Sequence, residues 1–190
     1  MIKHLGVNVR QVDTTAQHEL GAIVEDVEGG YGSSTRTIFP NGGAAETTTI
    51  YRSGSKRYQY VRADAAIAQY DACMRKAGES DAPFAVVKTT ASLQVLCSGI
   101  CEVSGVAADS YFWMTIHGYV PIANVADAAA ADEILSPSAT AGRLATATFT
   151  TTAATLDQLN AGVRTAMSGI LAVTDGNASN QAAVYIHGCG

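Results

Sequence analysis

The first side chains in this sequence that could perform chemistry are a serine and a lysine at catalytic spacing. Ser53 and Lys56 match the SxxK pattern, in which a lysine activates a serine nucleophile. They lie in a Gly/Ser stretch without the partner motifs of such enzymes, and short matches occur freely in such stretches. The pattern therefore favours a turn over a catalytic pair.

His117 with Ser98 or Cys97 is a second possible pair, in which the imidazole would act as base for a nucleophile. No acidic residue is visible that would orient the imidazole. A histidine on the same strand face as Trp113 is more often structural than catalytic. Carboxylates occur mostly singly, without a pair that could exchange acid and base roles. We therefore expect no catalytic residue and no enzyme, with a hydrolase as the weaker alternative.

Sites for nucleotides and zinc are incomplete. No lysine follows a glycine, so the phosphate-binding loop that ends in GK[ST] is missing. His18 and Glu19 begin a zinc-protease motif, but position 22 is Ala22 where the second histidine would stand. We expect His18 to be a solvent-exposed residue, and we predict no cofactor.

The alternating polar residues near the C-terminus resemble part of a calcium loop. Asp175, Asn177 and Ser179 have the required spacing, but the twelfth position is Ile186 where a glutamate closes the cage. A hairpin turn explains them better. The four cysteines lack a CxxC pair, which argues against zinc, and we expect free buried thiols, with a disulfide as the alternative: Cys73, Cys97, Cys101 and Cys189.

The charge balance excludes two classes of partner. The formal net charge is −5, and the 12 lysines and arginines are spread thinly, so there is no continuous positive surface for nucleic acid. No run of 18 apolar residues suggests a membrane span, and the N-terminus lacks the apolar core of a signal peptide. We expect a soluble protein that is synthesised in the cytoplasm.

Alternating and β-branched segments dominate the chain and predict a mainly β fold. Residues 57–63 alternate, and 111–120 form the strongest strand, with both faces apolar, at the expected centre of the core. Residues 64–74 could be a short helix or a turn followed by a strand. Turn signals recur about every ten residues, as in sandwiches and barrels.

We therefore predict a compact antiparallel β-sandwich or β-barrel over 21–190. A single short helix is expected at about 156–166, where apolar residues recur at steps of three and four behind a capping box. Residues 1–20 lack a period and are expected to form an extended N-terminal arm. Residues 29–49 are rich in Gly, Ser and Thr and predict a long loop or hairpin.

The order of the segments resembles that of capsid decoration (cement) proteins of tailed bacteriophages. It includes an aromatic strand with a glycine, followed by the sequence SATAG. The resemblance spans most of the chain, although the helix at 156–166 and the loop at 29–49 depart from it. The segments that carry it are 20–24, 58–63, 66–68, 105–107, 111–113, 116–118, 125–126, 138–144, 168–172 and 183–186.

The resemblance implies a structural protein on the outer surface of a phage head, where it stabilises contacts between capsomers. Its partners would be the major capsid protein and further copies of itself, as a trimer by analogy. Extended segments with few core residues can order on a partner surface, which points to 1–20, 29–49 and 146–155 as the gripping parts.

The alternative is a tail or head-surface adhesin, or a fibre component, that binds host glycans. Exposed tyrosines would form its binding platform. The candidates are Tyr31, Tyr51, Tyr58 and Tyr60. Tyrosines on alternating strands are also common as cross-strand packing pairs.

Overall fold

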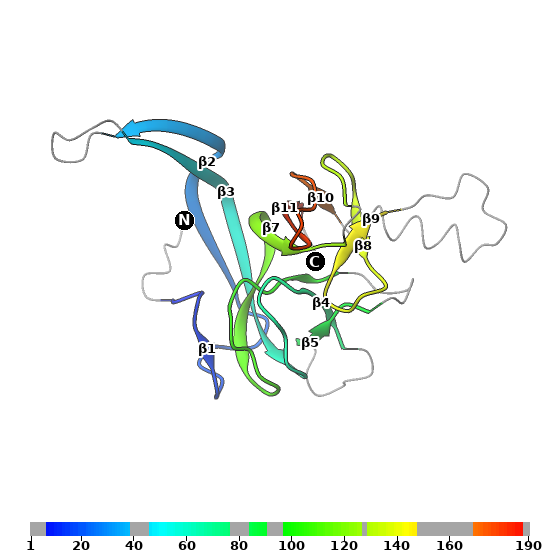
Figure 1. Cartoon of the computed structure of the whole chain (residues 1–190). Coiled ribbons are helices and arrows are strands. Elements are labelled where there is room, and N and C mark those ends of the chain that lie inside the picture. Colours follow the sequence, from blue (N-terminus) through cyan, green and yellow to red (C-terminus); the bar gives the residue numbers. More distant parts are fainter. Residues whose placement is uncertain are drawn as a thin grey trace.

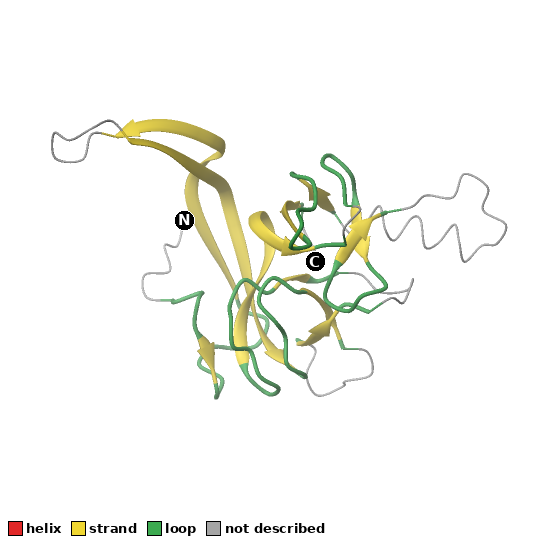
Figure 2. Ribbon diagram, in the orientation of Figure 1, coloured by secondary structure: helices red, strands yellow, loops and turns green. Residues whose placement is uncertain are grey.

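The computed structural model describes residues 7–38, 46–76, 84–90, 97–126, 129–147 and 169–187, with the backbone alone along 26–38 and 46–55. Strands are the regular elements of this described part (Figure 2). The predicted mainly β class is therefore confirmed. The helix predicted at 156–166 lies outside the described residues.

The described strands range from two residues to eighteen. Three are long, and they run beside one another in part of their length (Figure 1). In chain order the strands are β1 (Val12–Asp13), β2 (Ile23–Ile38), β3 (Glu46–Ala63), β4 (Ala72–Arg75), β5 (Ala85–Lys88), β6 (Gly99–Ile100), β7 (Tyr111–Asn124), β8 (Leu135–Pro137), β9 (Leu144–Thr146), β10 (Ile170–Ala172) and β11 (Gln181–Ile186).

Strand β7 is the centre of the fold, as its apolar sequence predicts. It pairs with β1, β3, β6 and β11, and most of its side chains are buried. At Gly118 its partner changes from β3 to β11, and the φ of +103° there is one that glycine adopts without steric cost. The strand continues past Pro121, which lies in a register shift opposite β11, where its missing N–H breaks no ladder.

Five strands form a closed cycle of backbone pairings, in the order β3, β7, β6, β4, β5 and back to β3. Four of these pairings are antiparallel, but β3 and β5 are parallel, so the expectation of an all-antiparallel sheet is wrong. A parallel pair needs a crossover between its strands, and β4 with its flanking segments provides this crossover. Of the two alternatives for 64–74, the structure has the turn and strand.

The buried side chains form three clusters around β7. The first lies between the end of β7 and the strands β8 to β11, and the second fills the space around Phe112 and Met114. The third is aromatic, with the Tyr60 and Trp113 ring centroids 5.0 Å apart. Both faces of β7 are therefore packed, which explains why its sequence shows no polar face.

Residues 7–20, predicted as an extended arm, contact this body at several points along their length. Strand β1 pairs with the start of β7, and Val7, Val9 and Leu20 pack against the aromatic cluster. The sequence misses this because a two-residue strand has no period of its own and depends on a partner about a hundred residues away.

Residues 29–38 and 46–49 belong to strands, so of the loop and the hairpin considered for 29–49 the structure has the hairpin. Its strands β2 and β3 pair from Ile38 and Glu46 down to Ile23 and Gln59. Strand β3 joins β7 only from Arg57 onward. We call the backbone of 28–38 and 46–55 the ribbon. It projects away from the body in Figure 1, where it is drawn in blue and cyan.

Candidate functional site

His117, Ser98 and Cys97, the residues of the second candidate pair, each contact other groups. His117 on β7 packs edge-on against Tyr185, with ring centroids 6.0 Å apart. Ser98 Oγ accepts a hydrogen bond from the backbone N–H of Arg75, and Cys97 Sγ donates to the carbonyl of Gly99. These contacts do not join His117 to Ser98 or Cys97, so they do not support the hydrolase alternative.

Lys56 of the first candidate pair is bonded to the body, whereas the side chain of Ser53 lies outside the described residues. Its Nζ lies 2.7 Å from Glu102 Oε1 and 3.0 Å from Oε2, and the side chains are mostly buried. Thr115 Oγ1 donates to the same carboxylate at 2.6 Å. Lys56 lies between the last residue of the ribbon, Ser55, and Arg57, where β3 joins β7, so these contacts fix the base of the ribbon.

The calcium-like residues cap a turn between β10 and β11. Asp175 Oδ1 accepts the N–H of Ala131 at 2.8 Å, and Asn177 Oδ1 accepts the N–H groups of Ser179 and Gln181. The hairpin-turn interpretation is therefore confirmed. In the part of the chain that the structure describes, no three His, Cys, Asp or Glu residues group as metal ligands.

Three of the cysteines are buried free thiols, as expected, and Cys189 lies outside the described residues. Burial raises the pKa of Cys73 well above its ordinary value, and it raises the pKa of Cys101 to about 12. The thiolate is the nucleophilic form. Cys73 and Cys101 are therefore protonated and unreactive near neutral pH.

The four tyrosines of the adhesin hypothesis do not form one exposed platform. Tyr58 is 8% exposed and Tyr60 is fully buried, because both belong to the aromatic cluster. Tyr31 and Tyr51 lie on the ribbon, where only the backbone is described. As a set the platform is therefore excluded.

Tyr60 joins the N-terminal segment to the aromatic cluster. Its hydroxyl donates to Asp13 Oδ2 at 2.7 Å and accepts the N–H of Gln17 at 3.1 Å. Burial raises the pKa of Tyr60 to about 12, and the adjacent carboxylate adds to this shift. His18 is exposed, as expected, but its ring also contacts those of Tyr60 and Trp113.

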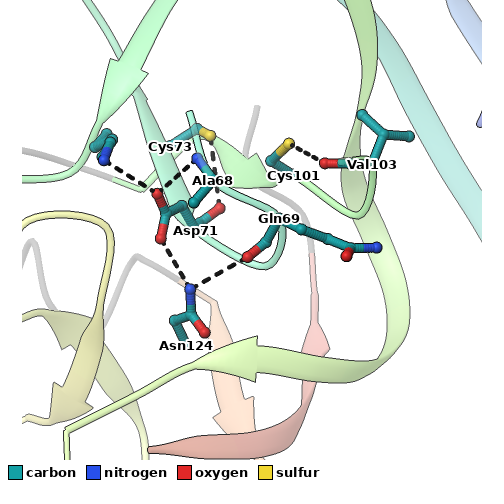
Figure 3. Close-up of polar contacts among 8 residues, drawn as sticks. Ala68, Gln69, Asp71, Cys73, Cys101, Val103 and Asn124 are labelled. Carbon is teal, nitrogen blue, oxygen red and sulfur yellow. Dashed lines mark hydrogen bonds and ion pairs between the residues drawn. The ribbon is translucent and has the colours of Figure 1, made fainter. Parts of the chain in front are cut away.

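Asp71 is a buried carboxylate that joins a turn to β7 (Figure 3). Its Oδ2 accepts the N–H of Ala68 at 3.0 Å, and its Oδ1 accepts Asn124 Nδ2 at 2.8 Å. Lys88 Nζ lies 3.6 Å from Oδ2. A Cβ at Gly142 would lie 2.6 Å from Oδ1, so the φ of +79° and the tight packing both require glycine there. Turn composition predicts the turn at Gly142, but no sequence signal points to Asp71.

An open pocket of about 350 Å³ lies beside the turn at 68–71. The N-terminal segment, strand β3, the turn at 68–71, the loop that follows β6, and strand β7 together bound this pocket. The side chains that line it include three aromatic rings and several polar groups: Arg10, Tyr58, Gln69, Tyr70, Ser104 and Trp113. The sequence gives no signal for this pocket because its walls come from distant segments.

Comparisons with known proteins give no further guide to this arrangement. No family model, no curated protein and no solved structure matches the chain. Among the described residues, no helix has the length and apolar composition that crossing a membrane requires.

Proposed function

We propose that this protein is a non-enzymatic capsid decoration protein, which attaches to the outer surface of a tailed-phage head through its ribbon. The observation that carries this proposal is the projection of β2 and β3 beyond the body. In the described pairings, residues 46–55 of β3 pair with β2 alone. Each of the two strands therefore has a free edge along the ribbon.

A two-stranded ribbon in water is only marginally stable, because it lacks a third strand or a packed face. Its free edges also present unpaired N–H and C=O groups, which native proteins usually shorten, cover or pair. A ribbon of this length should therefore be more stable against a partner surface than alone in water. Strand addition and packing on a neighbouring subunit would both satisfy its edges.

The body supports the ribbon as a rigid base. Strand β3 runs without interruption from the ribbon into the cycle, where Tyr60, Val61 and Ala63 are fully buried. Lys56 and Glu102 fix the junction. In this proposal the cycle is a small closed barrel, and force on the ribbon passes directly into it.

The identity of the partner rests on the order of segments, which resembles that of decoration proteins. The major capsid protein would bind the ribbon, and copies of this chain would assemble as trimers at local three-fold positions. Many modest contacts over the lattice would together resist the pressure of packed DNA. The protein would be synthesised in the host cytoplasm and found on the virion surface.

Cryo-electron microscopy of virions from the phage that encodes this chain tests the proposal. We expect regular external density that fits the body, with each ribbon lying across a boundary between capsomers. Absence of the chain from the head, or density at the tail alone, would contradict the proposal.

A glycan-binding role at the head or tail surface is the second candidate function. The pocket beside Tyr70 favours it, because the pocket combines aromatic rings with polar side chains. Tail density would favour this second candidate over decoration.

A further inference from the structure

Both aromatic and polar residues line the pocket beside the turn at 68–71, and we call Arg10, Gln69 and Ser104 its polar rim. Trp113 and Tyr58 are 2% and 8% exposed, so only small parts of their rings reach the opening. Tyr70 is half-buried and lines the same pocket. Its volume lies at the lower end of the range of small-molecule sites.

Tyr70 has a backbone conformation that its residue type disfavours. Its φ is +73°, whereas the other non-glycine residues with positive φ in the described chain are aspartates or an asparagine. Asp and Asn tolerate this region because their short side chains bond locally, but a bulky aromatic residue does not. Position 70 would accept glycine more easily on backbone grounds alone.

The surrounding structure holds Tyr70 in place from several sides. Its N–H donates to the carbonyl of Cys101, and its own carbonyl accepts the N–H of Asn124 at 2.9 Å. The N–H of Asp71 closes the turn on the carbonyl of Ala68. Strain of this kind persists where the fold over-determines it, and it is concentrated at functional sites. The fold therefore holds a tyrosine at position 70 although the backbone conformation there favours glycine.

The polar rim has the chemistry of a hydroxyl-rich ligand. Gln69 Nε2 donates to the carbonyl of Glu102 at 2.9 Å, which holds the amide plane in one orientation. The Glu102 carboxylate is already bonded to Lys56 and Thr115, so its charge is compensated within the fold. Arg10 and Ser104 are exposed and add a guanidinium and a hydroxyl to the rim.

We propose that this pocket binds a hexopyranose unit of a surface glycan, with Tyr70 as a stacking face for the sugar ring. The apolar C–H face of a sugar fits an aromatic ring, and its hydroxyls match the guanidinium, amide and hydroxyl groups of the rim. This inference rests on the second candidate function, glycan binding, and does not depend on attachment to heads. A failure of either one leaves the other standing.

Saturation-transfer NMR on the whole protein tests this inference with glucose, galactose, mannose, rhamnose, N-acetylglucosamine and glucuronic acid as probes. We expect at least one sugar to receive saturation, mainly on one ring face. Tyr70→Gly should weaken its binding by about tenfold, since the stacking face is removed. The thermal midpoint of Tyr70→Gly should stay the same or rise, because glycine relieves the positive φ.

Asp109→Gly is the matched control, since Asp109 also has a positive φ of 60° but does not line the pocket. It should bind sugar like the unaltered protein. If Tyr70→Gly fails to fold, Arg10→Ala replaces it, because Arg10 is exposed and its loss should weaken binding several-fold. No sugar binding, or unaltered binding in both pocket variants, would overturn the proposal. So would a lower thermal midpoint in Tyr70→Gly with sugar binding retained, since that result assigns the side chain to packing.

Discussion

The body and the ribbon use the same strand, β3, under opposite conditions. From Arg57 to Arg62 the strand pairs with β7, and its buried residues contribute to two core clusters. From Glu46 to Ser55 the same strand pairs with β2 alone. Local stability follows packing and pairing, so one continuous strand spans a stable and a weakly stabilised part. The difference indicates that packing and pairing are concentrated in the body, and our proposal assigns the completion of the ribbon to a partner.

The largest expected effect is in the body, at Phe112. This side chain is fully buried in the second core cluster, so Phe112→Ala should lower the free energy of unfolding by about 3–5 kcal/mol. Urea denaturation measures the loss. Ile23→Ala is the control, since Ile23 is 52% exposed and should lose about 0.5 kcal/mol or less. Equal losses would contradict the assignment of the core.

Alkaline pH should destabilise the body through Tyr60. Its pKa is raised from 10.0 to about 12 in the folded state, so the folded chain keeps this proton at pH values where the unfolded chain has released it. The contribution is complete below pH 10 and is lost as the pH rises to about 12, at about 2–3 kcal/mol. Urea denaturation across this range measures the decline.

Tyr60→Phe is the matched control for this titration, because it keeps the ring and removes the ionisable hydroxyl. It should be less stable than the unaltered protein at neutral pH, since Asp13 and Gln17 lose a hydrogen-bond partner. Its stability should decline less between pH 10 and 12. An equal decline in both proteins would assign the effect to other groups.

At the junction of the two regions, Glu102→Gln should cost about 1–3 kcal/mol. The change removes the charge that faces the mostly buried ammonium of Lys56. Lys56→Met combined with Glu102→Gln should recover part of the loss, because the unpaired charge is then gone. Thermal denaturation of Glu102→Gln, of Lys56→Met alone and of the double variant checks this. Additive losses would argue against a coupled pair.

The smallest expected effect on stability comes from shortening the ribbon. Val27 and Ser55 are opposite each other, so an Asn-Gly turn between them can replace 28–54. The body should lose about 1 kcal/mol or less, since none of its described clusters includes the removed residues. In the unaltered protein, amide hydrogens of the ribbon should exchange much faster than those of β7. Equal protection would remove the contrast between the two regions.

Sequence patterns predicted those elements whose signal is local. The strands at 57–63 and 111–120 were recognisable because the first alternates in polarity and the second is rich in aromatic and β-branched residues. The parallel pairing of β3 with β5 and the docking of β1 on β7 depend on distant partners, which no local period encodes. The pocket was missed for the same reason, and the positive φ of Tyr70 runs against its residue type.

The most direct test of attachment through the ribbon is co-sedimentation with phage heads that lack the protein. The unaltered chain should sediment with the heads, whereas the folded variant with 28–54 replaced by Asn-Gly should stay in the supernatant. Equal binding of the two proteins would contradict the account, because the body alone would then carry the attachment.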